Sequence, residues 1–172
     1  GATGGVGSVA TMILAKLGYS VVAVTGRMEH EGFLKSLGAA EVIERAELDR
    51  DAKPMEKERW AGVVDAVGGK TLATAIAQTK YGGTVTACGL AGGFALNSTV
   101  MPFILRGVKL IGIDSVMASL EKRNKAWQRL AKDIDHALLE RLTTEISFSD
   151  LPSACADLLE GRTKGRMVVK IG

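Results

Sequence analysis

Cysteine and histidine are scarce in this sequence of 172 residues, which contains two of each. Cys88 and Cys155 are too few for a disulfide framework, and neither they nor the two histidines show metal-ligand spacing, so we expect no metal site. No apolar run approaches the roughly 20 residues of a membrane span, and no signal peptide is visible. We therefore expect a cytoplasmic protein that has no membrane partner.

An excess of charge of one sign is also lacking. The 22 Lys and Arg residues nearly balance the 19 Asp and Glu residues, which leaves a net charge of +3. Basic groupings such as residues 121–125 lie in a helical pattern with acids nearby, so no nucleic-acid partner is indicated. Aromatic residues contribute only 5%, but hydrophobic residues contribute 47%, which is enough for a substantial core. The 21 glycines favour repeated tight turns between strands and helices.

The first 27 residues carry the most specific signal. Glycines at positions 1, 4, 5 and 7 precede an apolar helical segment over residues 6–17, and residues 20–25 have the pattern of a buried β-branched strand. A Gly-rich turn, a helix and a strand in this order are typical of a βαβ nucleotide-binding unit. The glycines let a pyrophosphate approach bare backbone N–H groups, where the helix N-terminus adds partial positive charge. Because the spacing departs from G-x-G-x-x-G, a Gly-rich loop that only packs the helix onto the sheet is the alternative.

The residues after this strand predict which cofactor is bound. A fold that binds NAD places Asp or Glu here, where the carboxylate hydrogen-bonds the ribose 2′-hydroxyl. This sequence instead has Thr25, Gly26 and Arg27, with no carboxylate before Glu29. A guanidinium pairs with a 2′-phosphate and a threonine hydroxyl can donate to it, whereas a carboxylate would repel it. We therefore predict NADP as the cofactor, and the alternative is that Arg27 is a solvated loop cation.

Strand and helix patterns alternate over the next part of the chain. The expected strands are residues 41–44, 62–67, 83–88 and 108–114, and helical patterns over residues 29–37, 70–79 and 101–106 separate them. This alternation predicts an α/β fold, a doubly wound parallel (Rossmann) sheet covered on both faces. Residues 45–60 are charged, contain Pro54 and are expected to form a surface loop. The chain starts at a fingerprint glycine with no strand before it, so we expect a fragment whose strand 1, central in the order 3-2-1-4-5-6, lies upstream.

The pattern changes beyond residue 118. A long amphipathic helix over residues 120–142 precedes a strand over 143–148, a helix that ends at Glu160 and a last strand over 166–171. This helix-strand-helix-strand tail does not extend a doubly wound sheet. We therefore divide the chain into an NADP-binding Rossmann domain, residues 1–118, and a C-terminal segment, residues 119–172, that leaves this domain to complete a neighbouring one.

Ligands of open α/β sheets bind beyond the carboxyl ends of the strands. Three such ends here carry small residues or backbone turns, and we expect their N–H groups to hold the nicotinamide ribose and carboxamide. The candidates are Ala66, Val67, Cys88, Gly89, Leu90 and Ser115. Cys88 is more simply explained as a small buried residue than as a redox group. Asp65, within an apolar strand, could bond either a ribose hydroxyl or the turn backbone.

Several longer stretches together resemble one known family: GATGGVGS, VTGR, VDAVGG, CGLAGG, MPFILRGVKLIGIDSV and GRMVVKI. They are similar, nearly end to end, to the medium-chain dehydrogenase/reductase superfamily and within it to the zinc-independent, quinone-oxidoreductase-like branch of bacterial acrylyl-CoA reductases. The resemblance implies a pyrophosphate loop at Thr3, Gly4, Gly5 and Val6 and a 2′-phosphate clamp at Thr25, Gly26 and Arg27. It also implies nicotinamide-side contacts at Cys88, Gly89 and Leu90, and a basic residue, Arg166, that reaches back to the cofactor cleft.

The resemblance also implies a catalytic domain that is mostly absent from this chain and to which residues 119–172 return. It implies an activity as well. NADPH would deliver hydride to the β-carbon of acryloyl-CoA, and the enolate left at the thioester would be protonated at the α-carbon to give propanoyl-CoA, with no obligatory metal. This part of the chain supplies no obvious proton donor, so the catalytic residues stay unassigned, and Tyr81 is expected at the surface. Two alternatives stay open: a reductase of quinones or other enones with the same fold, and an NADPH-binding module without turnover.

The resemblance finally implies an assembly. In this superfamily the sixth strand commonly pairs across a two-fold axis, and residues 108–113 are apolar enough to need such cover. We therefore expect a homodimer through the sixth strand, with a small-molecule substrate as the other partner.

Overall fold

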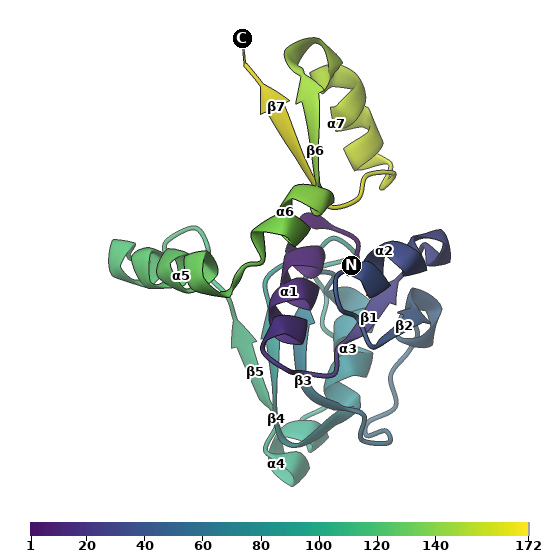
Figure 1. Ribbon diagram of the computed structural model, residues 1–172. Coiled ribbons are helices and arrows are strands. Elements are labelled where there is room, and N and C mark those ends of the chain that lie inside the picture. Colours follow the sequence, from purple (N-terminus) through teal and green to yellow (C-terminus); the bar gives the residue numbers. More distant parts are fainter. Residues whose placement is uncertain (172) are drawn as a thin grey trace. The chain divides into compact units, whose positions relative to one another are not determined.

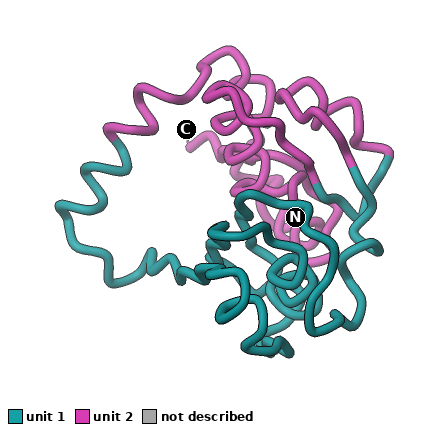
Figure 2. The backbone as a smooth tube through the Cα atoms, turned by 90° about the horizontal axis from the view of Figure 1, so that it is seen from below, with its two compact units in different colours: residues 1, 24–28, 43–127 teal, residues 2–23, 29–42, 128–172 magenta. Residues whose placement is uncertain are grey.

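The computed structural model describes residues 1–171 (Figure 1). The chain divides into two compact units, which Figure 2 shows in different colours. The first unit comprises Gly1, Val24–Met28 and Ile43–Trp127. The second unit comprises Ala2–Ala23, Glu29–Val42 and the described residues from Gln128 onward.

The first unit is built on a parallel sheet with the strand order β3-β4-β5. The strands are β3 (Trp60–Asp65), β4 (Thr79–Ala87) and β5 (Lys109–Gly112), and the unit's helices are α3 (Gly69–Ala77) and α4 (Met101–Arg106). Leu72 and Ile76 of α3 pack with Val85 and Val108 in a buried core. The strands and helices predicted for this stretch are confirmed, with shifted ends. Thr79 is one such shift, since it begins β4 rather than ending the preceding helix.

Strands β1 (Val22–Thr25) and β2 (Glu41–Glu44) form a separate hydrogen-bonded pair. A doubly wound order 3-2-1-4-5-6 that is read without its strand 1 consists of two pieces, 3-2 and 4-5-6. The observed groups, β2-β1 and β3-β4-β5, match these pieces in order. The strand order therefore has the topology that the sequence predicts for a Rossmann sheet.

The second unit packs helices α1 (Gly5–Lys16) and α2 (Glu31–Ser36), the latter preceded by a 3₁₀ turn at Met28–His30. Met12, Leu37 and Leu142 form one buried cluster of this unit, and Ala23, Leu34 and Ala39 form another. Gly38 adopts φ = +96°, and a Cβ there would lie 2.5 Å from the Ala15 Cβ. Only glycine both adopts this conformation readily and leaves space for α1.

The C-terminal part corrects one prediction. Residues 120–142 are not a single helix but two, α5 (Leu120–Asp133) and α6 (His136–Leu142). The break occurs because Asp135 is an N-cap: its Oδ1 accepts the Leu138 N–H at 3.1 Å, and its backbone is extended. The remaining predicted elements are confirmed as β6 (Thr143–Ser147), α7 (Leu151–Leu159) and β7 (Arg166–Lys170), with a 3₁₀ turn at Phe148–Asp150. Strands β6 and β7 pair in parallel, so β6, α7 and β7 form a βαβ unit.

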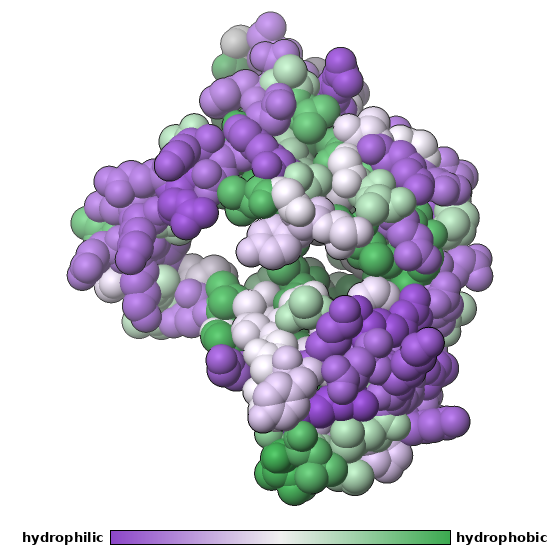
Figure 3. Space-filling model, turned by 60° about the horizontal axis from the view of Figure 1, so that its bottom comes forward, coloured by the Kyte–Doolittle hydropathy of each residue, from purple (hydrophilic) through white to green (hydrophobic). Residues whose placement is uncertain are grey.

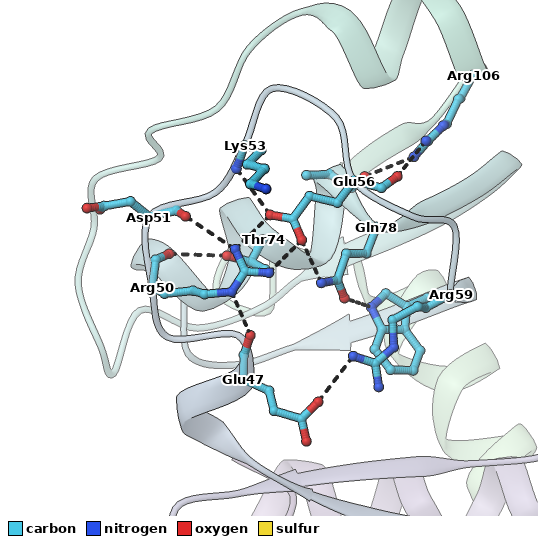
Figure 4. Close-up of polar contacts among 11 residues, drawn as sticks. Glu47, Arg50, Asp51, Lys53, Glu56, Arg59, Thr74, Gln78 and Arg106 are labelled. Carbon is cyan, nitrogen blue, oxygen red and sulfur yellow. Dashed lines mark hydrogen bonds and ion pairs between the residues drawn. The ribbon is translucent and has the colours of Figure 1, made fainter.

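The charged segment between β2 and β3 is fixed by ion pairs (Figure 4). After a 3₁₀ turn at Arg45–Glu47, Glu56 receives two bonds from the Arg50 guanidinium, at 2.7 and 2.5 Å, and one from the Gln78 amide at 2.8 Å. The Trp60 indole donates to the other end of the Gln78 amide at 3.0 Å. This segment is therefore a loop, as predicted, but one with a fixed polar network that attaches it to the end of α3.

This network predicts a pH-dependent contribution to stability. The Arg50 guanidinium holds the pKa of Glu56, whose side chain is 9% exposed, at about 2, below its ordinary value of 4.5. Glu56→Gln should therefore lower the free energy of unfolding by about 1–3 kcal/mol at pH 7. The difference should be complete above pH 4.5 and disappear as the pH falls towards 2, because the wild-type carboxylate is then protonated as well.

Urea unfolding at a series of pH values measures this difference, with Glu41→Gln on the exposed edge of β2 as the control that should change little. Equal stability of Glu56→Gln and wild type at pH 7 would contradict the assignment.

Candidate cofactor-binding site

The N-terminus of α1, whose N-cap is Gly4, carries neither a capping side chain nor a negative charge in its first turn. The first N–H groups of an α-helix have no partner within the helix and carry partial positive charge. Thr3, just before the helix, is buried, whereas Val6 in the first turn is about half exposed.

A cation from the other end of the chain lies at this helix terminus. A Cβ on Gly5 would be 3.0 Å from Cζ, Nε and Nη1 of Arg166, so the guanidinium occupies the space beside the bare backbone. The first residues of β7 are held there because the Gly165 N–H donates to the Thr3 carbonyl at 2.8 Å. Among residues 1–171, no ion pair involves Arg166. The predicted proximity of Arg166 to the glycine-rich turn is present within the second unit.

A second cationic group, which sequence analysis missed, lies against the turn after β1. The Thr25 hydroxyl is buried and accepts the Arg27 N–H at 3.0 Å, which sets the course of the backbone through Gly26. A Cβ on Gly26 would lie 3.0 Å from Cζ and Nη2 of Arg45, a residue of the 3₁₀ turn after β2. No carboxylate forms an ion pair with Arg45 within residues 1–171. Only the general proximity of strand ends in such folds could have indicated Arg45, because in the sequence it is one cation of a charged loop.

The ends of β3 and β4 meet backbone against backbone. A Cβ on Gly89 would lie 2.5 Å from the Ala66 carbonyl oxygen, and the Gly92 N–H donates to the Val67 carbonyl at 2.7 Å. The predicted strand-end residues Ala66, Val67, Cys88, Gly89 and Leu90 are therefore neighbours within the first unit. The prediction that backbone groups rather than side chains line these ends is compatible with this packing.

Asp65 bonds the turn backbone, which decides between the two interpretations left open above. Its carboxylate is 4% exposed, and Oδ2 accepts the Gly68 N–H at 2.8 Å. Burial raises the pKa of Asp65, and hydrogen bonds from the Gly68 and Val67 N–H groups partly oppose that rise. The carboxylate is a structural acceptor at the end of β3.

Cys88 is exposed as a residue, but its thiol is turned towards the strand end, where Sγ donates to the Asp65 carbonyl at 3.2 Å. Partial burial raises the pKa of the Cys88 thiol, and the nearby Asp65 adds to the effect. A thiol with a raised pKa is a poor nucleophile. The prediction that Cys88 is a buried residue at the strand end is wrong, since the residue is exposed. Its hydrogen-bonded thiol gives no support to a redox role.

Ser115 lies in the loop after β5 and makes none of the contacts that join the other candidates. Its carbonyl accepts Nη2 of Arg123 at 2.5 Å, and the neighbouring Asp114 accepts the N–H groups of Val116 and Met117 at 2.9 Å each. These backbone hydrogen bonds lower the pKa of Asp114. The loop is ordered locally by Asp114, and Ser115 remains a candidate from the sequence alone.

Residues 1–171 contain neither a metal-ligand cluster nor a membrane-spanning helix. No group of three or more His, Cys, Asp or Glu side chains there could hold a metal ion. No helix in the same range has the length and hydropathy needed to cross a bilayer.

Comparison with known proteins shows which family the chain belongs to. Residues 5–132 match the family described as zinc-binding dehydrogenase, although the described residues offer no donor set for zinc. The chain is 54% identical over 172 residues to an acrylyl-CoA reductase of Ruegeria pomeroyi, covering 99% of this chain and 52% of that protein. It is 46% identical to a putative quinone oxidoreductase of Bacillus subtilis, again covering 99% and 52%. The chain thus spans about half the length of the curated relatives it matches.

Solved structures of related oxidoreductases have the same fold as this chain. The yhdH oxidoreductase of Salmonella enterica, in complex with NADP, superposes with a TM-score of 0.97 at 50% identity and covers 100% of this chain and 53% of its own. The YhfP protein of Bacillus subtilis, with NAD bound, superposes with a TM-score of 0.93 at 45% identity, covering 99% and 53%. The Rossmann fold class and the resemblance found in the sequence are confirmed. The chain belongs to the zinc-binding dehydrogenase family of the medium-chain dehydrogenase/reductase superfamily.

Proposed function

We propose that this chain is the NADPH-binding part of an oxidoreductase that reduces an activated C=C bond, with acryloyl-CoA as the substrate. The observation that carries the proposal is the pair of arginines at the turn after β1: Arg27 follows Gly26 in the chain, and the Arg45 guanidinium packs against Gly26. Two guanidinium groups suit a 2′-phosphate dianion, and the Thr25 hydroxyl, which accepts the Arg27 N–H, holds the turn beside them. The Salmonella enterica protein was solved in complex with NADP and the Escherichia coli protein with NADPH bound, and each is 50% identical to this chain.

In this proposal, three groups of residues bind three parts of the cofactor. The N-terminus of α1, with Thr3, Gly4, Gly5 and Val6, would hold the pyrophosphate together with Arg166. Thr25, Gly26, Arg27 and Arg45 would hold the 2′-phosphate. Backbone groups of Ala66, Val67, Cys88, Gly89, Leu90 and Ser115 would orient the nicotinamide half.

The bound cofactor would supply the hydride, and the described residues would bind and orient it. Tyr81, which the sequence predicts to lie at the surface, is 78% exposed in β4. Its backbone N–H donates to the Glu58 carboxylate. We therefore place protonation of the substrate and stabilisation of its thioester oxyanion outside residues 1–171.

A quinone or other enone as substrate is the second candidate, favoured by the relative named as a putative quinone oxidoreductase. A binding module without turnover is the third.

We further propose a cytoplasmic homodimer, with residues 1–118 as the cofactor domain and residues 119–172 as the segment that completes a catalytic domain. Exposed apolar side chains support an interface on the first unit: Ile104 of α4 is 72% exposed, and Ile111 and Ile113 at β5 are nearly half exposed. Hydrophobic surface also gathers at the lower edge of the view in Figure 3. Burial of such residues in a second copy would stabilise the assembly.

The cofactor preference tests the arginine pair. Arg27→Ala and Arg45→Ala should each raise the Kd of NADPH about 10- to 100-fold, because each removes a charge-assisted bond to the 2′-phosphate, and should leave the Kd of NADH within about twofold. Titration calorimetry with both cofactors measures this, with Lys57→Ala, an exposed cation elsewhere, as the control. Equal losses for NADPH and NADH would contradict the assignment.

The pyrophosphate site gives a different signature. Arg166→Ala and Gly5→Ala should weaken NADPH and NADH alike, by about tenfold, since both cofactors carry the same diphosphate. Arg141→Ala, an exposed arginine of α6, is the matched control. A change confined to NADPH would show that Arg166 belongs to the 2′-phosphate site instead.

The reaction itself is tested with the full-length enzyme. Loss of NADPH absorbance with acryloyl-CoA should exceed that with a quinone by at least about tenfold in kcat/KM, because a site built for the thioester loses that binding energy with a quinone. The reverse order would favour the second candidate, and tight NADPH binding with neither substrate consumed would favour the binding module.

A further inference from the structure

Asp65 contacts both strand-end segments of the proposed nicotinamide site, and it is the residue of the turn after β3 that does so with its side chain as well as its backbone. Through its side chain it holds the turn after β3, where Oδ2 accepts the Gly68 N–H at 2.8 Å. Through its carbonyl it holds the segment after β4, accepting the Cys88 N–H at 2.9 Å and the Cys88 thiol at 3.2 Å. Asp65 thus connects the two segments that would carry the nicotinamide contacts, in addition to the backbone bond from the Gly92 N–H to the Val67 carbonyl.

The other contacts between these segments join backbone groups, among them the bond from the Gly92 N–H to the Val67 carbonyl at 2.7 Å. The segments approach too closely for side chains to separate them, since Gly89 lies against the Ala66 carbonyl and a Cβ on Gly68 would be 2.4 Å from the Gly93 carbonyl. Gly68 adopts φ = +73°, a conformation that costs glycine little and therefore gives the turn little stiffness of its own. The position of the turn depends on a few hydrogen bonds, and only Asp65 among its residues supplies one from a side chain.

Burial of the Asp65 carboxylate at the end of β3 has a desolvation cost. Asp65 ends an otherwise apolar strand, and burying an ionisable group there is unfavourable unless its hydrogen bonds compensate. An apolar residue would satisfy the strand equally well but would leave the Gly68 and Val67 N–H groups without an acceptor. The bonds to the turn are therefore the reason that a carboxylate suits this position.

We propose, on the basis of the function proposed above, that Asp65 is a positioning residue that fixes the two backbone segments holding the nicotinamide half of the cofactor. It need not touch the cofactor. Removing it would let the turn at Ala66 and Val67 move, and a small displacement of the nicotinamide is enough to impair binding of that half and hydride transfer. The adenosine half, held at Thr25, Gly26 and Arg27, would be unaffected.

Comparison of two ligands tests this with the full-length chain. 2′,5′-ADP carries only the adenosine half, whereas NADPH carries both halves. Asp65→Ala should raise the Kd of NADPH about tenfold, leave the Kd of 2′,5′-ADP within about twofold, and reduce the fluorescence enhancement of the bound nicotinamide. Asp65→Asn should restore most of the NADPH affinity, because its amide oxygen still accepts an N–H from the turn.

Two further variants sharpen the test. Gly89→Ala displaces the Ala66 carbonyl from the other side and should reproduce the selective loss of NADPH affinity, even if Asp65→Ala does not fold. Thr86→Val removes a hydrogen bond between the same two strands, from Oγ1 to the Val63 carbonyl at 3.1 Å, and should leave the ratio of the two Kd values unchanged.

The outcomes separate the two proposals. Equal weakening of both ligands by Asp65→Ala, or by Gly89→Ala where the former does not fold, would overturn the positioning role in favour of a general structural one. Unchanged NADPH binding would overturn it as well. Failure of the wild-type protein to bind either ligand would instead overturn the proposed cofactor site, and the assignment of Asp65 with it.

Discussion

The absence of a Cβ at a few turns is the constraint on which the candidate site depends. At Gly5 and Gly26 an arginine guanidinium lies 3.0 Å from where a Cβ would be, and at Gly89 a carbonyl oxygen lies 2.5 Å from it. Any side chain at these positions would push the neighbouring group away. The glycines therefore serve a double purpose, because they leave backbone N–H groups uncovered and let distant parts of the chain approach them.

The charges gathered at these turns differ in kind from those in the rest of the first unit. Apart from Arg45, the arginines between β2 and β3 and at the end of α4 have carboxylate partners: Arg50 pairs with Glu56, Arg59 with Glu47 and Arg106 with Glu58. These pairs attach a loop to its unit. Arg166 instead lies at the positive end of α1, an arrangement that costs about 0.5 kcal/mol unless an anion lies between the cation and the helix. Within residues 1–171, Arg45 and Arg166 form no ion pair, and cations that lie beside uncovered backbone N–H groups suit the binding of a phosphate group.

The local features of this molecule could be predicted from the sequence because they depend on neighbouring residues. The helix over residues 6–17, the strand at 41–44 and the short helix at 101–106 follow from apolar periodicity and from the glycines that end or precede them. The single helix predicted over residues 120–142 was wrong. Its apolar spacing continues through the break, and the signal for the break, Asp135 as an N-cap, was outweighed by that spacing.

By itself, the sequence determined the order of the elements, the glycine-rich turn before α1 and the lack of a carboxylate after β1. All of these depend on residues a few positions apart, within reach of one turn or one strand. The tertiary structure alone decided that Arg166 lies at Gly5, that Arg45 packs on Gly26, and that Asp65 bonds the turn after β3. The two arginine contacts join residues far apart in the chain, so they depend on how strands and helices pack. The Asp65 bond is local, but the sequence allowed two partners, and the buried geometry at the strand end selected one.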